Sequence, residues 1–273
     1  MKKLIHAGIT SLFLLFSISL LAHGDLDERI QQVSEEIKSA PENGELYYKR
    51  GVLFFQHEEY KHSIRDLRKA RSKGFSDVLL DLHLSKDYKA LKKYKKASRL
   101  LNEILEEDSH NVHALKTLGQ IAFERKQFEK AALLLHQVIE VTIRAFPENY
   151  IDAAKAYASA ENKTMNRKAI ELLKNGIEDL GPAIVFYEEI RRLSLRDKNY
   201  HEAIWAQEEI LKLLDRKESA YYQLAELYFA KGEEAFGIQY LFAAKNELKK
   251  LPQRIRKTIA MMALEQKIQN HLN

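Results

Sequence analysis

Apolar and small residues recur along this chain at α-helical spacing, and the whole pattern repeats about every 34 residues. The clearest unit runs through Leu115, Leu118, Gly119, Phe128, Ala131, Leu135, Val138 and Ile139. A small residue marks the same place in six units: Ser63, Ala97, Ala131, Ala169, Ala203 and Gly237. Their successive separations are 34, 34, 38, 34 and 34 residues. This period predicts stacked helix-turn-helix hairpins.

Two other places keep the same phase. Twelve residues before the marked position of a unit, a second small residue recurs: Gly51, Ser85, Gly119 and Ala225. Four residues later stand leucines: Leu67, Leu101, Leu135, Leu173 and Leu241. Tyr157, Arg191 and Gln207 depart from this pattern, which predicts looser packing or a shifted register in the fourth and fifth units. We interpret the interval of 38 as one additional helical turn around residues 141–145.

On these residues, and on aromatic Tyr60, Tyr94, Phe128 and Tyr200, the chain resembles the tetratricopeptide repeat family over residues 44–251. The resemblance implies an all-α fold, a right-handed superhelical solenoid of about six hairpins. The expected units are 44–77, 78–111, 112–149, 150–183, 184–217 and 218–251. A half repeat over 25–43 and a helix over 252–273 are expected to cap the ends, because terminal repeats must cover their apolar flanks. In the second cap, Ile255, Ile259 and Met262 are expected to share one face.

The first 24 residues have the order of a secretory signal peptide. Lys2 and Lys3 precede an apolar stretch over residues 9–22, and Ala22-His23-Gly24 suits cleavage after Ala22 or Gly24. An uncleaved membrane anchor is the alternative interpretation. The chain has no cysteine, so neither a disulfide nor a lipidated cysteine can form. We expect export to the periplasm or cell envelope of a bacterium.

Positive charge is concentrated in one part of the chain. The formal net charge of +5 falls to +3 without Lys2 and Lys3, yet residues 61–99 hold 13 Lys or Arg against 4 Asp. One interpretation is that these side chains form solvated outer helix faces. The alternative is a surface for anionic lipid head groups or acidic proteins. For an exported protein, nucleic acid is not an expected partner.

The resemblance further implies that function resides on the concave surface, which the first helix of every hairpin lines. The candidate groove residues combine aromatic rings with cations, a composition typical of recognition surfaces: Tyr48, Phe55, Lys86, Lys89, Lys116, Phe123, Arg192, Tyr222 and Phe229. The alternative is that the four rings Tyr48, Phe55, Tyr222 and Phe229 only fill space between hairpins. One subset of the family clamps acidic chaperone tails with a basic and asparagine set, and the matching places here lack it: Tyr48, Val52, His83, His113 and Thr117.

No phosphate loop, nucleophile elbow or two-histidine zinc motif occurs in the sequence. We therefore expect no catalytic residue, no cofactor and no enzyme activity, but a scaffold that binds another protein or peptide, with an acidic one favoured. A second hypothesis is copper handling, because cleavage after Ala22 would place the imidazole of His23 beside a free terminal amine. Self-association through an incompletely capped end is a third.

Overall fold

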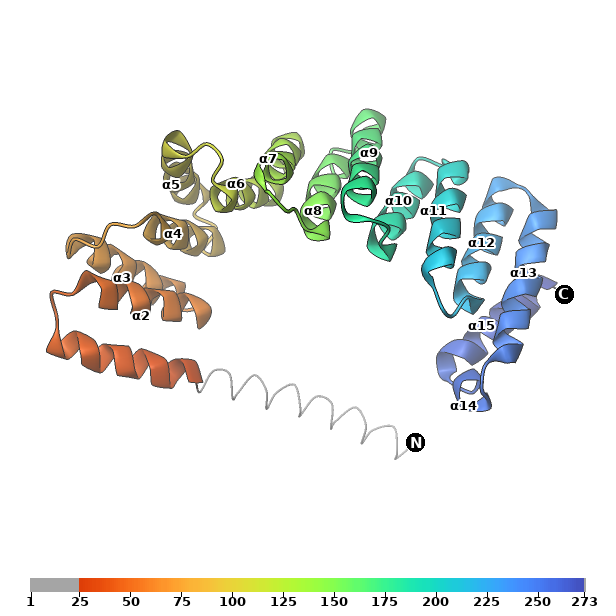
Figure 1. The fold of residues 1–273 in the computed structure, drawn as a ribbon, viewed down its shortest axis with the longest axis horizontal. Helices are drawn as coiled ribbons and strands as arrows, with labels where there is room; N and C mark the ends of the chain where they lie inside the picture. The colour runs from red at the N-terminus through yellow and green to blue at the C-terminus, as the bar shows by residue number, and fades with distance from the viewer. Residues whose placement is uncertain (1–24, 273) are drawn as a thin grey trace. The chain divides into compact units, whose positions relative to one another are not determined.

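The computed structural model describes residues 25–272, and within that range the chain forms helices and no strand (Figure 1). The expected all-α fold is confirmed; the right-handed superhelix stays a prediction. The predicted signal segment, with His23, lies outside the described residues. No helix of the described part is long and apolar enough to cross a membrane. The chain divides into two compact units, Met1–Glu124 and Arg125–Asn273.

In the first unit, paired helices stack side by side. A helix over residues 25–39 precedes five others: α2 (Gly44–Gln56), α3 (Tyr60–Ser72), α4 (Val78–Ala90), α5 (Tyr94–Glu107) and α6 (Val112–Glu124). Within the hairpins α2 packs on α3 and α4 on α5, while α3 contacts α4 and α5 contacts α6. Because α4 also contacts both α2 and α6, these three helices form one layer.

The second unit repeats this arrangement and adds two helices at its C-terminal end. Its helices are α7 (Phe128–Val141), α8 (Pro147–Ala158), α9 (Lys163–Leu180), α10 (Ile184–Arg196), α11 (Tyr200–Leu213), α12 (Glu218–Lys231), α13 (Glu234–Lys250), α14 (Gln253–Arg256) and α15 (Ile259–Leu272). The hairpins are α8 with α9, α10 with α11, and α12 with α13. Helix α7 packs on α8, and α15 packs on α13.

The small residues that mark the repeat lie where paired helices cross. All six are buried: Ser63, Ala97, Ala131, Ala169, Ala203 and Gly237. At the second marked place, a Cβ atom on Gly51 would lie only 2.9 Å from the side chain of Leu67, sixteen residues later. Close helix crossing leaves no room for a larger side chain. The predicted role of these positions is confirmed.

In the fifth hairpin, Arg191 and Gln207 occupy the two places that Gly51 and Leu67 fill in the first. They form a polar contact where the first hairpin has an apolar one. The Arg191 guanidinium donates a hydrogen bond to Gln207, again sixteen residues later, and another of 2.7 Å to Gln223. The Gln207 side chain is fully buried, and its amide donates to the carbonyl oxygen of Ala220 at 3.2 Å. The two departures from the repeat therefore compensate each other, since the buried amide has partners on both sides.

The interval of 38 residues has a different cause from the one expected. Residues 142–146 are not helical, so the additional turn predicted around 141–145 is wrong. Phe146 is extended before Pro147, because proline disfavours helical backbone in the residue that precedes it. The additional length lies in α9, which has 18 residues against 14 in α7. Asn162 caps this early start by accepting a hydrogen bond of 2.9 Å from the Met165 N–H.

The C-terminal segment packs through other residues than predicted. Leu264 and Ile268 of α15 are buried in a cluster with Leu241 and Leu248 of α13. The expected apolar face of Ile255, Ile259 and Met262 is wrong: Ile259 and Met262 are exposed. The reason is a break in the helix at residues 257–258, which resets the helical phase between α14 and α15.

Gly44, which the repeat pattern does not single out, is the tightest backbone contact of the first hairpin. A Cβ atom there would lie 2.8 Å from the backbone oxygen of Ala70 and 2.9 Å from Cβ of Phe75. We expect Gly44→Ala to lower the free energy of unfolding by about 1–3 kcal/mol, because backbone cannot yield as a side chain can. Urea denaturation measures this, with the exposed neighbour Glu45→Ala as control. Equal stability of the two variants would contradict the predicted clash.

Candidate binding pocket

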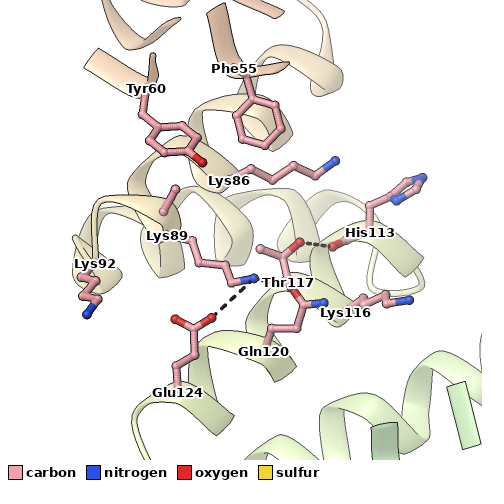
Figure 2. A pocket seen from close by; sticks show the side chains of 11 residues that line it. Phe55, Tyr60, Lys86, Lys89, Lys92, His113, Lys116, Thr117, Gln120 and Glu124 are labelled. Carbon is pink, nitrogen blue, oxygen red and sulfur yellow. Dashed lines mark hydrogen bonds and ion pairs between the residues drawn. The ribbon is translucent and has the colours of Figure 1, made fainter. Parts of the chain in front are cut away.

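The first unit contains an open pocket of about 470 Å³ between α4 and α6 (Figure 2). Its lining residues on these helices recur every three or four positions, so each helix presents one face to the pocket. Phe55 at the end of α2 and Tyr60 at the start of α3 close one side. The full lining is Phe55, Tyr60, Lys86, Lys89, Ala90, Lys92, His113, Lys116, Thr117, Gln120 and Glu124.

The pocket carries an excess of positive charge, with four lysines against one glutamate. Lys89 Nζ donates to Gln120 Oε1 at 2.6 Å and lies 3.6 Å from Glu124 Oε1, an ion pair that Figure 2 shows. In contrast, Lys86 and Lys116 form no ion pair with any carboxylate of the described residues. One lysine is therefore neutralised locally, and those two remain to attract an anion.

Aromatic rings form the apolar side of the pocket. The Phe55 ring lies 5.8 Å from the Tyr60 ring and 6.0 Å from the His83 ring, between centroids. The Tyr48 ring also lies 5.9 Å from the His83 ring, and it stacks on Phe75 at 4.7 Å. Burial, and next the charge of Lys86, lower the pKa of His83. The imidazole is therefore neutral at pH 7, and it serves as packing rather than as a further cation.

The structure brings together four of the nine predicted groove residues, namely Phe55, Lys86, Lys89 and Lys116. Tyr48 instead lines a neighbouring pocket with Arg29 and Val33 of the N-terminal helix. Phe123 is on α6 and is partly exposed.

The remaining three predicted residues belong to the second unit. There Arg192 donates two hydrogen bonds, of 2.9 and 2.6 Å, to the carboxylate of Glu189. Phe229 stacks on His271 of α15 at 5.6 Å, and Tyr222 meets the same ring edge-on at 6.1 Å. These two rings are partly buried against the C-terminal cluster, so in this structure they serve packing, and Arg192 is already paired.

Several lining residues escaped the sequence prediction because they stand outside the regular groove positions. Lys92 occupies the turn after α4 with φ of 55°, in the left-handed region. The corresponding turns contain Glu58, Lys126 and Lys198 with φ of 55–60°. The repeat could therefore have been used to predict that Lys92 lies in a turn, since it marks one turn residue in each of these hairpins. Glu124 gave no signal, because its role depends on the conformation of Lys89.

Cationic, aromatic and amide side chains make up most of the pocket lining. Among residues 25–272, no group of three or more His, Asp or Glu side chains is arranged to hold a metal ion. His113 lines the pocket, and its backbone oxygen accepts a hydrogen bond of 2.8 Å from Thr117 Oγ1. Cationic, aromatic and amide groups together suit an acidic ligand with an apolar portion.

Comparison with known proteins agrees with the repeat architecture. Residues 88–142 match the family model of the tetratricopeptide repeat. The formate-dependent nitrite reductase complex bifunctional subunit NrfFG of Haemophilus influenzae is 22% identical over 156 residues, which are 56% of this chain and 38% of that protein. The chain thus spans well under half the length of this curated relative.

Solved structures share the fold at low sequence identity. The C-terminal part of a TPR repeat-containing protein from Cytophaga hutchinsonii has a TM-score of 0.68 and 13% identity, covering 88% of this chain and 94% of that one. A tetratricopeptide repeat protein from Parabacteroides merdae has a TM-score of 0.54 and 13% identity, covering 94% and 96%. One segment of the chain thus matches the tetratricopeptide repeat, and the described residues share the fold of tetratricopeptide repeat proteins.

Proposed function

We propose that this protein is a noncatalytic scaffold of a bacterial cell envelope, which holds an acidic segment of a partner protein in the pocket between α4 and α6. The tetratricopeptide repeat fold supports a role in protein–protein interaction. The name of the relative from Haemophilus influenzae describes a subunit of a complex, which agrees with an assembly role.

One observation carries the proposal: Lys86 and Lys116 line the same pocket from two neighbouring helices, and neither is paired with a carboxylate of the described chain. An acidic side chain of a bound segment would supply that carboxylate. The ring of Phe55 offers an apolar contact beside it, so an acidic residue near a bulky apolar one would be favoured. Gln120 and Thr117 can form hydrogen bonds with the backbone of the segment.

We expect the double variant Lys86→Glu/Lys116→Glu to lose the partner, because two attractive contacts become repulsive. Native and variant proteins would serve as bait for a detergent-solubilised envelope fraction, followed by calorimetry with the acidic segment of the captured protein. Affinity should fall at least tenfold, and its salt dependence should weaken.

The matched control is Lys61→Glu/Lys93→Glu, which reverses two exposed charges of the same unit outside the pocket. It should retain the partner. Equal loss in both variants would show that only the overall charge matters, and equal retention would place the partner elsewhere on the protein. Circular dichroism would verify that both variants keep the helical content of the native chain.

Export is a separate part of the proposal and rests on the sequence of residues 1–24. N-terminal sequencing of the protein from an envelope fraction should show that the segment has been removed. A first residue of Asp25 would exclude the copper hypothesis, because that hypothesis requires His23 at the terminus. Recovery of the chain with Met1 intact would contradict cleavage and favour the anchor.

A further inference from the structure

A second basic pocket lies in the first unit, between α3, α4 and α5, with a volume of about 460 Å³. Five cations line it, namely Arg68, Arg71, Lys95, Lys96 and Arg99, and no carboxylate of residues 25–272 is part of the lining. The positive residues of segment 61–99 are therefore not all spread over solvated helix faces. The fold gathers five of its cations around one cavity.

This pocket is separate from the one between α4 and α6. Leu84 and Tyr88 of α4 line it, whereas Lys86 and Lys89 of the same helix line the other pocket. Because successive helical residues diverge by about 100°, these two pairs point to opposite sides of α4. A ligand in one pocket need not touch the residues that bind in the other.

Two of the cations, Arg68 and Lys96, contact the buried ring of Tyr88. Tyr88 is only 5% exposed, and its hydroxyl oxygen accepts a hydrogen bond of 2.6 Å from Arg68. The guanidinium carbon of Arg68 lies 5.9 Å from the ring centroid, and Lys96 Nζ lies 5.7 Å from it. Cation–π contact orients these groups without cancelling their charge.

Neutralisation inside the described chain is incomplete. Arg71 pairs with Asp81, and Arg99 Nε lies 3.2 Å from Glu103 Oε1. Arg68, Lys95 and Lys96 form no ion pair with a carboxylate of residues 25–272. Three cations around one cavity therefore lack a counter-charge, and their mutual repulsion would decrease if an anion bound there.

We propose that this pocket binds a phosphomonoester, carried by a lipid head group or by a small soluble molecule. Such a group has a charge near −2 and three terminal oxygens, so it can accept hydrogen bonds from several cations at once. Arginine matches it through the planar fork of its guanidinium, and lysine adds a point charge. A single carboxylate has two oxygens and one charge, and would leave most of these donors unused.

The test compares two phosphate probes with a carboxylate probe on the full chain. Glycerol phosphate, titrated by calorimetry, is the soluble probe. Phosphatidylcholine vesicles with and without phosphatidic acid, followed by co-sedimentation, present the same phosphomonoester on a lipid. Succinate is the matched dianion without phosphorus. The test variant is Lys95→Gln/Lys96→Gln, in which both replaced side chains are exposed, and the control is Lys61→Gln/Lys93→Gln.

We expect the native protein to bind at least one phosphate probe, with succinate at least tenfold weaker. The Lys95→Gln/Lys96→Gln variant should lose at least tenfold in affinity, and the control should bind as the native protein does. Binding of the soluble probe alone, or of the vesicles alone, supports the pocket and identifies the carrier. No binding of either phosphate probe, equal binding of succinate, or equal weakening in the control would overturn the proposal.

Phosphate binding should not depend on the pocket between α4 and α6. The variant Lys86→Glu/Lys116→Glu should still bind the phosphate probe, because its substitutions lie on the other side of α4. Loss of phosphate binding in that variant would contradict the assignment to the second pocket. Loss of the protein partner with phosphate binding retained would distinguish the two sites.

Discussion

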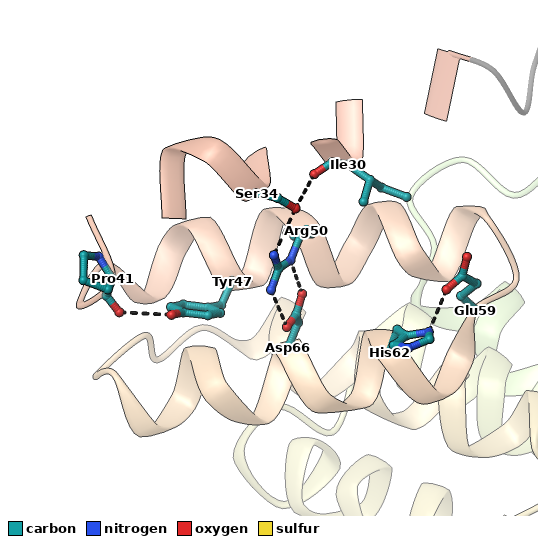
Figure 3. A network of polar contacts seen from close by, with 8 residues as sticks. All are labelled: Ile30, Ser34, Pro41, Tyr47, Arg50, Glu59, His62 and Asp66. Atoms are coloured by element: carbon teal, nitrogen blue, oxygen red, sulfur yellow. Dashed lines mark hydrogen bonds and ion pairs between the residues drawn. The ribbon is translucent and has the colours of Figure 1, made fainter. Parts of the chain in front are cut away.

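Replacing Arg50 with methionine should lower the free energy of unfolding by about 3–5 kcal/mol, the usual cost of removing one partner of a buried ion pair. Arg50 Nε donates to Asp66 Oδ2 at 2.6 Å, and Nη2 donates to Oδ1 at 3.0 Å (Figure 3). The Asp66 side chain is only 6% exposed, so the variant would leave a charged carboxylate buried without its counter-charge.

The same arginine also attaches the N-terminal helix to the first hairpin. Its Nη1 donates to Ser34 Oγ at 3.0 Å, and that hydroxyl donates to the backbone oxygen of Ile30 at 2.6 Å. Arg50 further lies over the rings of Tyr47 and Phe54, at 5.9 and 5.8 Å. We therefore expect faster amide hydrogen exchange in residues 25–39 of the variant, in addition to its lower stability.

Two comparisons separate the buried pair from arginine removal in general. Arg71→Met breaks an ion pair with Asp81 whose side chains are 49% and 32% exposed, so it should cost less than about 1 kcal/mol. The double variant Arg50→Met/Asp66→Leu should recover much of the loss, because no uncompensated charge remains. If Arg50→Met cost no more than Arg71→Met in urea denaturation, the pair would not have the proposed role.

The parts of the fold that were predictable from sequence are those that repeat. Small residues such as Ser63 and Ala97 recur because every helix crossing imposes the same steric limit, so their spacing revealed the hairpins. Arg191 and Gln207 occupy two of the recurring positions and contact each other through a hydrogen bond. In sequence, these two residues were only departures from the pattern, since nothing in a spacing states that they are hydrogen-bonded to each other.

What was not predictable depends on particular side-chain conformations or on single junctions. The Lys89 contact with Glu124 is one such case, because the two residues are 35 positions apart and on different helices. The position of α15 is another. A final helix over residues 252–273 was predicted, but not that His271 would cover Phe229 and Tyr222. Four predicted groove residues line one pocket of the first unit, while the rings of Tyr222 and Phe229 in the second unit are covered. That the groove binds a partner stays a prediction.

Asp87 is the second residue for which we expect a large effect, and the effect depends on pH. Its side chain is fully buried on α4, where Oδ2 accepts a hydrogen bond of 2.7 Å from Ser63 Oγ and Oδ1 has no hydrogen-bond partner among the described residues. Burial raises the pKa of this carboxyl to about 7, although the hydrogen bond from Ser63 opposes the shift. The folded chain therefore retains a proton that the unfolded chain releases near pH 4.

The sign of the pH dependence follows from that difference. Below pH 4 both states hold the proton, and the carboxyl costs nothing. As the pH rises from about 4 to about 7, the unfolded state binds fewer protons than the folded state, so the free energy of unfolding decreases. A pKa difference of roughly three corresponds to a loss of up to about 4 kcal/mol, complete above pH 7. Most of the loss should be present before neutral pH is reached.

The variant Asp87→Asn isolates this contribution, because it keeps the shape of the side chain and cannot ionise. Its stability relative to the native protein should increase from about pH 4 to about pH 7 and then level off, as measured by urea denaturation between about pH 4 and about pH 8. Asp81→Asn removes a carboxyl of the same helix that is partly exposed, and it should not show such an increase. Parallel curves for Asp87→Asn and the native protein would mean that Asp87 stays ionised throughout. The free carboxylate oxygen would then need a partner that these helices do not provide, because a buried charge without one is strongly destabilising.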